Sequence, residues 1–129
     1  MNGKFLLDTN IIIALFAKDE NVSQKVTQTD GVFASSIVVG ELLFGALKSG
    51  RVKANVQRVE NFASKTVTLI CDIETAKHYA RIKNDLRRAG KPIPENDIWI
   101  AALALQHALV LVTRDAHFSE VDGLTVVRW

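Results

Sequence analysis

Four acidic side chains stand where neither a solvated helix face nor a local cation explains them. Asp8 and Asp115 each follow a short apolar run, so both are expected just beyond the carboxyl end of a strand. Glu41 has apolar residues or glycine three and four positions away on both sides, which places it on the inward stripe of a helix. Asp97 has apolar residues three, four and seven positions later on the same face. Asp85, between arginines on a polar helix, is by contrast typical of a solvated residue.

Each of the four acids also has a purely structural explanation. Asp8 and Asp97 can cap the helices that follow them. Asp115 can form a turn or pair with an arginine, and Glu41 can reach water past its apolar neighbours. Taken together, however, two strand-end acids and two inward-facing helix acids can meet at one end of a small sheet.

Several carboxylates at one place need a counter-charge. Two of them about 4 Å apart repel by roughly 4 kcal/mol at an effective dielectric constant of ~20, so a proton or a metal ion must compensate. A set of oxygen ligands without histidine suits Mg²⁺ or Mn²⁺. Such an ion activates water and stabilises the charge that develops on a phosphate during attack on a phosphodiester. The four acids therefore predict the hydrolysis of a nucleic acid.

Short apolar strand patterns alternate with longer helical patterns along the chain. Strands are expected at residues 5–7, 32–34, 67–71, 109–113 and 124–127. Helices are expected at residues 11–18, 36–48, 52–63, 74–89 and 97–107, the second capped by Ser35 or Ser36 and the last by Asn96 or Asp97. Near-continuous apolar strands separated by helices predict a three-layer α/β fold, with a central, mostly parallel sheet of about five strands. Ligands bind such sheets beyond the carboxyl ends of the strands.

Length and composition predict one domain, residues 1–129, because a chain of 129 residues has room for a single hydrophobic core. The longest apolar runs, residues 11–17 and 98–105, are too short to cross a bilayer, and no signal peptide precedes them. The single cysteine cannot form an internal disulfide, so we expect a cytoplasmic protein. A net charge of +2 neither requires nor excludes a nucleic-acid partner.

The sequence resembles the PIN-domain ribonucleases, and specifically the VapC-type toxins of prokaryotic toxin–antitoxin pairs, over nearly its whole length. Any one of the shared motifs is weak, but their order and spacing together are specific. The resemblance rests on FLLDTN at residues 5–10, GEL at 40–42 with GALKSG at 45–50, NDIWIAA at 96–102, and TRD at 113–115 with HF at 117–118.

The resemblance implies that the four acids form one pocket for Mg²⁺ or Mn²⁺, in which Asp8 and Asp97 are the foremost ligands. Three polar residues are expected to orient the acids or the attacking water: Thr9, Asn10 and Thr113. The resemblance further implies an endoribonuclease that often acts on structured RNA such as transfer RNA, forms a homodimer, and is held inactive by a VapB-type antitoxin.

Residues 77–91 carry six basic side chains against a single acid, Asp85. A solvated helix face is the common explanation of such a segment. Because the segment leads directly into the helix that carries Asp97, we also expect it to contact the RNA backbone. The expected RNA-binding residues are Arg81, Lys83, Arg87, Arg88 and Lys91.

The remaining residues of chemical interest have structural explanations. His78, His107 and His117 lack the mutual spacing of a metal site and are expected on the surface or in packing. Cys71 is expected in a core strand without a base to activate it. Trp99 and the apolar run at residues 11–16 are expected in the core or at an interface.

Two other functions fit parts of the pattern. An aspartyl phosphatase would use Asp8 as its nucleophile, but Asn10 stands where that chemistry needs a second acid. A non-catalytic nucleic-acid-binding or protein-binding module on the same fold would use the acids only as helix caps.

Overall fold

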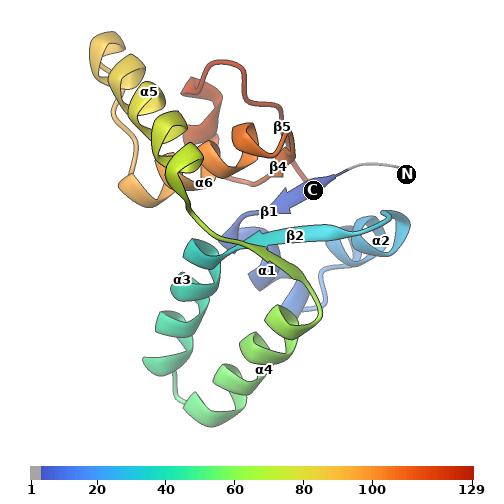
Figure 1. The fold of residues 1–129 in the computed structure, drawn as a ribbon. Helices are drawn as coiled ribbons and strands as arrows, with labels where there is room; N and C mark the ends of the chain where they lie inside the picture. The colour runs from blue at the N-terminus through green and yellow to red at the C-terminus, as the bar shows by residue number, and fades with distance from the viewer. Residues whose placement is uncertain (1–3) are drawn as a thin grey trace.

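A computed structural model describes residues 4–129, in which short strands alternate with helices (Figure 1). The elements are, in chain order, β1 (Phe5–Leu7), α1 (Thr9–Phe16), α2 (Glu20–Gln28), β2 (Val32–Ser35), α3 (Ser36–Leu47), α4 (Val52–Ser64), β3 (Val67–Leu69), α5 (Ile73–Ala89), α6 (Glu95–Gln106), β4 (Val110–Val112), the 3₁₀ helix η1 (Ala116–Glu120) and β5 (Val126–Val127).

The strands form one sheet in the order β3-β2-β1-β4-β5, and every pairing is parallel. This confirms the expected α/β architecture. The chain begins at β1 in the middle, builds towards β3 at one edge, and then crosses to β4 on the other side of β1. The direction of winding therefore reverses between β1 and β4, which is where an open parallel sheet forms its ligand crevice. Leu7 pairs with Val112 at this point, so the two strands end side by side.

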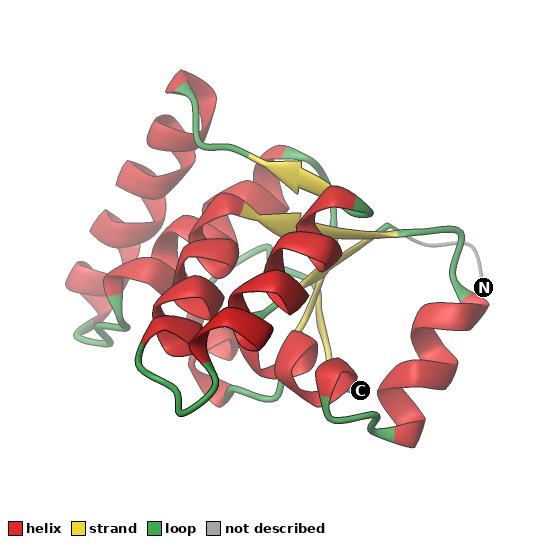
Figure 2. Cartoon of the chain, turned by 90° about the horizontal axis from the view of Figure 1, so that it is seen from below, coloured by secondary structure: helices red, strands yellow, loops and turns green. Residues whose placement is uncertain are grey.

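Helices cover both faces of the sheet. Helices α5 and α6 pack against each other on one side of β1 and β2, and α3 and α4 pack against each other on the other side (Figure 1). The view from below shows the strands fanned between the two helical layers (Figure 2). Leu6, Ile12, Ile100, Leu111 and Phe118 are fully buried in the core between them. Burial of each such side chain contributes about 1.5–3 kcal/mol to the stability of the fold, and this stabilises the sheet whose strand ends carry Asp8 and Asp115.

Two helices begin at residues other than those expected, for local reasons. Helix α1 begins at Thr9 because the Asp8 carboxylate accepts a hydrogen bond from its first N–H, and it ends before Lys18, whose φ of 62° is left-handed. Helix α6 begins at Glu95, with Pro94 at the N-cap. The expectation that Asn96 or Asp97 caps α6 is therefore wrong, because both residues lie within the helix. Asp97 lies inside the first turn, where its carboxylate is free for other contacts.

The sequence patterns missed two helices and misplaced one residue. Helix α2 buries only Val22 and η1 only Phe118, so neither has the repeating apolar stripe that marks a longer helix. Cys71 was expected in a core strand, but β3 ends at Leu69 and the thiol is exposed. Among residues 4–129, no helix has the length and apolar composition needed to cross a membrane.

Candidate active site

Asp8 occupies the first position after β1 and is only 5% exposed. One carboxylate oxygen accepts a hydrogen bond from the backbone N–H of Thr9 at 2.8 Å. The other accepts from the hydroxyl of Thr113 at 2.7 Å and from the side-chain amide of Asn10 at 3.3 Å. Burial raises the pKa of Asp8, and repulsion from Glu41 and Asp115 raises it further, while the hydrogen bonds from Thr113 and Thr9 act in the opposite direction.

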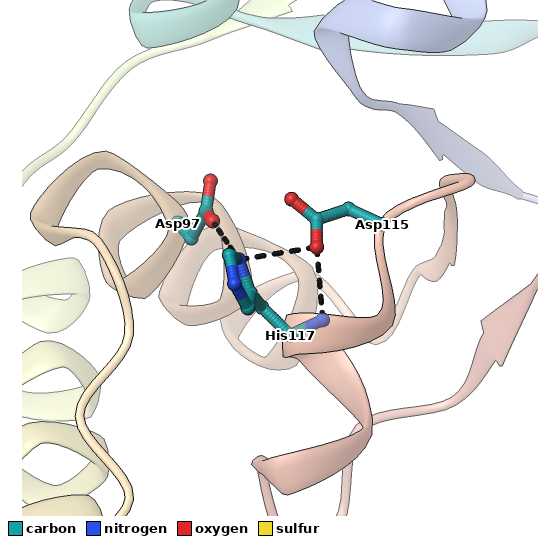
Figure 3. A group of neighbouring side chains, drawn as sticks. All are labelled: Asp97, Asp115 and His117. Carbon is teal, nitrogen blue, oxygen red and sulfur yellow. Dashed lines mark hydrogen bonds and ion pairs between the residues drawn. The ribbon is translucent and has the colours of Figure 1, made fainter.

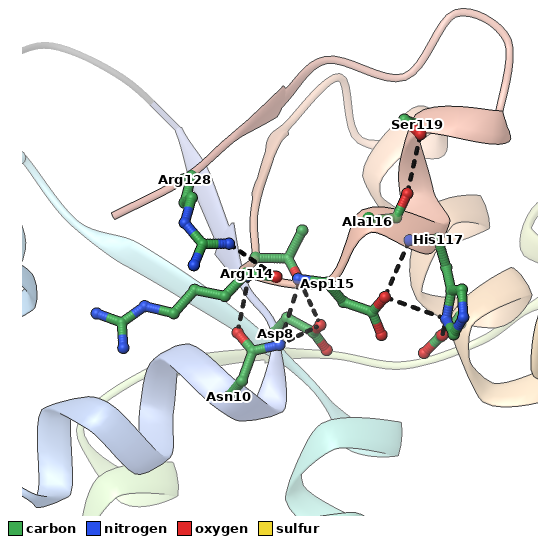
Figure 4. A network of polar contacts seen from close by, with 10 residues as sticks. Asp8, Asn10, Arg114, Asp115, Ala116, His117, Ser119 and Arg128 are labelled. Carbon is green, nitrogen blue, oxygen red and sulfur yellow. Dashed lines mark hydrogen bonds and ion pairs between the residues drawn. The ribbon is translucent and has the colours of Figure 1, made fainter.

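Thr113 connects the strand ends. Its buried hydroxyl donates to Asp8 and accepts from the backbone N–H of Asp115 at 3.0 Å and from Asn10 at 3.3 Å. A hydroxyl has one hydrogen to donate and two lone pairs, so all of its capacity is used. The side-chain oxygen of Asn10 accepts from the backbone N–H of Arg114 at 3.1 Å. Thr113 and Asn10 thereby fix the loop after β4 against the start of α1. Figure 4 shows Asn10 on α1 beside Arg114 of this loop.

Asp97 faces the region around Asp8 from the first turn of α6, which lies in the helical layer opposite that of α3 and α4. Its side chain is 14% exposed. Burial is the main cause that raises its pKa to about 6, and the charges of Asp8 and Asp115 add to the effect, which His117 partly offsets. The raised pKa of Asp97 thus reflects a carboxyl that is largely buried beside two other acids.

Asp115 and His117 complete the group from the loop after β4 and from η1. One carboxylate oxygen of Asp115 accepts from the backbone N–H of His117 at 2.9 Å and so caps η1. The same oxygen lies 3.1 Å from Nδ1 of His117, and Nδ1 is also 3.5 Å from an oxygen of Asp97. Figure 3 shows the imidazole turned towards both carboxylates.

Glu41 approaches from α3 and joins the site through α1. Its carboxylate accepts a hydrogen bond from the hydroxyl of Thr9 at 2.8 Å, and its charge acts on Asp8. The side chain is half-buried, as expected for the inward stripe of its helix. Glu41 thus lies at the margin of the site, towards the groove between α1, α3 and α4 that it lines together with Thr9.

Positive charge is scarce around these acids. Among residues 4–129, His117 is the one basic side chain in contact with any of the four acids. Arg114, although it is the immediate neighbour of Asp115, points away from it (Figure 4). Its guanidinium pairs with Asp19 at 3.0 Å and donates to the carbonyl oxygen of Trp129 at 2.8 Å.

The donor set fits a divalent cation. Carboxylate oxygens from three separate elements converge on one place, and two of the carboxyls have raised pKa values, mainly because they are buried and further because other acids lie near them. Hard divalent cations prefer such oxygen ligands. Asp97 and Asp115, together with His117, offer ligand atoms that all lie within 4.8 Å of one another. Asp8 adjoins this group through Thr113, whereas Glu41 lies outside it.

Two of the acids also have the structural roles that the sequence allowed as alternatives. Asp8 does cap α1, but only one oxygen serves that purpose, and the other accepts hydrogen bonds from Thr113 and Asn10. Asp115 likewise caps η1, and it does not pair with Arg114. His117 lies against Asp97 and Asp115, although the lack of metal-site spacing among the three histidines predicted only a surface or packing role for it. The informative signal was its position two residues after a strand-end aspartate.

The residues expected to contact RNA lie away from the acids, on and just after α5. All five are exposed: Arg81, Lys83, Arg87, Arg88 and Lys91. Lys83 pairs with Glu95, and Lys91 pairs with Glu120 at 3.1 Å, so both carry less free charge than the sequence suggests. Tyr79 hydrogen-bonds to Glu95 and stacks on Trp99 at 4.0 Å between ring centroids, which joins α5 to α6.

The chain matches one protein family and a group of its curated members over nearly its full length. Residues 5–124 match the PIN domain family. Ribonuclease VapC2 of Haemophilus influenzae is 36% identical over 129 residues, which cover 98% of both chains. The tRNA(fMet)-specific endonuclease VapC of Shigella flexneri is 34% identical, again with 98% of both chains covered.

Solved structures agree with this placement. The DNA-bound VapBC of Salmonella typhimurium aligns with a TM-score of 0.91 at 34% identity over 98% of both chains. The VapBC-1 structure from nontypeable Haemophilus influenzae aligns with a TM-score of 0.88 at 30% identity, also over 98% of both chains.

Proposed function

The chain belongs to the PIN-domain family, and from this premise we propose that it is an endoribonuclease and the toxin of a VapBC-type toxin–antitoxin pair. It acts as a single domain, in the cytoplasm, on RNA. The observation that carries the proposal is the group of acids at the crevice between β1 and β4, where charge is left uncompensated and oxygen donors converge.

We propose that the site works with a divalent cation, Mg²⁺ or Mn²⁺, held by Asp8, Asp97 and Asp115, with Glu41 at its margin. When bound, such an ion lowers the pKa of water and stabilises negative charge on a phosphate. The chain itself fixes the carboxylates in advance. Thr113 holds Asp8, and the cap of η1 holds Asp115, so little reorganisation is needed on binding.

Thr9 and Asn10 support this arrangement from the first turn of α1. Thr9 fixes one oxygen of Glu41, and Asn10 bonds to both Asp8 and Thr113. The burial that raises the pKa of Asp8 and Asp97 also lowers the local dielectric constant. A positive charge on a ligand is therefore more strongly attracted there than on the open surface.

The substrate proposed is a structured RNA of the transfer RNA class. The support is the relative from Shigella flexneri, whose name specifies tRNA(fMet), and the basic face of α5. Arg81, Arg87 and Arg88 pair with no carboxylate in the part of the chain that the structure describes, and we assign them to phosphate contacts. Lys83 and Lys91, already paired with acids, contribute less.

The partner proposed is a VapB-type antitoxin, because the solved relatives are VapBC structures. A groove of about 390 Å³ runs between α1, α3 and α4. Ile13, Phe16 and Val59 line it, and it opens on Thr9 and Glu41 at the margin of the acidic site. We place an antitoxin segment in this groove, where it would block approach to the acids. The homodimer implied by the resemblance stays a prediction.

Induced expression in a bacterium without the antitoxin tests the toxin function. The wild type should arrest growth, and RNA from the arrested cells should carry new ends at defined positions. Asp8→Asn should do neither. Asp85→Asn, which removes an exposed acid on α5, is the matched control and should behave as wild type. Growth arrest by Asp8→Asn at an equal protein level would contradict the proposal.

A further inference from the structure

His117 holds its imidazole against two of the acids by the fold of η1. The helix begins at Ala116, capped by Asp115, and Phe118, the residue after His117, is fully buried in the core. The buried side chain of Phe118 fixes the backbone of η1 and thereby restricts the directions in which the neighbouring imidazole can point. Nδ1 faces Asp115 and Asp97, while 53% of the side chain stays exposed on the open side of the site (Figure 3).

The spacing of the three donor atoms matches that of neighbouring ligands on one ion. Two ligands at adjacent corners of an octahedron with bonds of about 2.1 Å lie about 3.0 Å apart. Nδ1 lies 3.1 Å from the nearer oxygen of Asp115 and 3.5 Å from that of Asp97. All three atoms lie within 4.8 Å of one another. A ring nitrogen therefore occupies a ligand position in what the sequence predicts to be an all-oxygen site.

We propose that His117 is a nitrogen ligand of the catalytic cation and that it shifts the preference of the site from Mg²⁺ towards Mn²⁺. This rests on the proposed metal-dependent function. Mg²⁺ takes oxygen ligands and dehydrates reluctantly. Mn²⁺ is the first member of the transition-ion series that binds nitrogen ligands, whereas Mg²⁺ lies outside that series, so replacing one oxygen ligand by an imidazole nitrogen favours Mn²⁺ over Mg²⁺.

The competing explanation is that His117 only donates a hydrogen bond that positions Asp115. Asn distinguishes the two roles, because its side-chain amide places a donor near the position of Nδ1 but has no imidazole nitrogen. His117→Asn should keep a positioning role and lose a ligand role. His107 offers the matched control, since it lies at the C-cap of α6, at the opposite end of that helix from Asp97.

Electron spin-echo spectroscopy of bound Mn²⁺ measures the ligand directly, without reference to activity. The protein is prepared with ordinary histidine and with ¹⁵N-histidine, and loaded with Mn²⁺ alone. We expect a nitrogen modulation that changes with the isotope, persists in His107→Asn, and disappears in His117→Asn. By calorimetry, His117→Asn should weaken Mn²⁺ binding by about tenfold or more, and Mg²⁺ binding by less than about threefold.

The outcomes separate this inference from the function on which it rests. Mn²⁺ binding with no histidine-derived modulation would overturn the ligand role of His117 and leave the metal-dependent ribonuclease standing. Full Mn²⁺ affinity in His117→Asn would do the same. If neither ion binds the folded wild type, the metal-dependent function itself fails, and the ligand role fails with it.

Discussion

At the scale of single residues, the hydroxyl of Thr113 connects the parts of the site that come from different strands. It donates to the carboxylate of Asp8 and accepts from the backbone N–H of Asp115, so one atom sets the positions of two acids. Residues 8 and 113 are far apart in sequence, and the pairing of β1 with β4 is what brings them together. The site therefore depends on sheet register as much as on its charged residues.

Removing this hydroxyl should loosen both acids. Thr113→Val keeps the shape but leaves the buried carboxylate of Asp8 and the N–H of Asp115 each short of a partner. We expect a loss of about 1–3 kcal/mol in the free energy of unfolding and a fall of about 10–100-fold in RNA cleavage. Thr113→Ser restores the hydroxyl and should recover most of both. Equal loss in the Val and Ser variants would contradict the role of the hydroxyl.

Asp97 makes the stability of the metal-free protein depend on pH. Its folded pKa, about 6, lies above the value near 3.9 expected in the unfolded chain. Between these values the folded state holds the extra proton, so the free energy of unfolding should fall as pH rises from about 4 to 6, and the deficit should persist at pH 7.

The Asp97→Asn variant checks this sign. In EDTA at pH 7 it should be more stable than wild type by about 1–3 kcal/mol, because one pKa unit corresponds to about 1.4 kcal/mol. The gain should shrink towards pH 4. Thermal unfolding at pH 5 and pH 7 measures both effects. If the variant is less stable than wild type at pH 7, or if its free energy of unfolding changes by the same amount at pH 5 and pH 7, the pKa of Asp97 is not raised by folding.

The sequence predicted the four acids as candidate site residues because their apolar neighbours and their positions at expected strand ends can be read from the sequence. They could not show how tightly each acid joins the group. Glu41 lies at the margin and Asp97 inside its helix turn, and both facts depend on where α3 and α6 sit. His117 was overlooked because its relation to Asp97 crosses from η1 to α6, and no local spacing records such a contact.

At the scale of elements, α5 is the feature that connects the fold to its proposed substrate. It packs on α6, and the stack of Tyr79 on Trp99 fixes the two helices together. Its exposed face carries arginines without acidic partners among the described residues. A phosphate backbone bound along α5 would therefore be held by a helix rigidly connected to the one that carries Asp97.

Charge reversal on α5 tests this role. Arg87→Glu with Arg88→Glu should weaken RNA binding by about tenfold or more and reduce the steepness of its salt dependence, because fewer phosphate counterions are released. The double variant Lys53→Glu with Lys65→Glu makes the same charge change on exposed residues of and after α4, and it should have a much smaller effect. Equal effects of the two double variants would show that RNA binding depends only on the net charge of the protein and not on the position of the arginines on α5.

The strands and longer helices could be predicted because their apolar patterns are strong and because some of them, such as α3 and α5, have conventional caps in Ser35 and Asp72. Gly90, for example, ends α5 in the left-handed conformation, with φ of 69°. The helices that were missed bury one residue each, so their formation depends on tertiary contacts that the sequence pattern does not carry. The start of α6 at Glu95 follows from Pro94 rather than from the polar residues that looked like caps.

At the scale of the whole molecule, the apolar groove adjoins the acidic site, since Thr9 and Glu41 line the groove and lie at the margin of the site. A partner seated in the groove can therefore control access to the acids without altering them. The relatives from Salmonella typhimurium and Haemophilus influenzae were solved as VapBC.

A charge in the groove should release the toxin from its partner. Ile13 is 54% exposed and lines the groove, so Ile13→Glu should fold normally. We expect its RNA cleavage to be unchanged and about tenfold more antitoxin to be needed for inhibition. Ile73→Glu, at an exposed isoleucine outside the groove, is the control. The measurement is a titration of cleavage with the cognate VapB-type antitoxin. Unchanged inhibition of Ile13→Glu would place the antitoxin elsewhere.

The central claim is that these acids cut RNA with a divalent cation, and cleavage of a total-RNA pool by the purified protein, free of antitoxin, tests it most directly. Wild type, Asp97→Asn and Asp85→Asn are compared with Mn²⁺, with Mg²⁺ and with EDTA. We predict discrete fragments from wild type and Asp85→Asn only when an ion is present, and at least about a 100-fold loss in Asp97→Asn. Undiminished cleavage in EDTA, or by Asp97→Asn, would contradict the account.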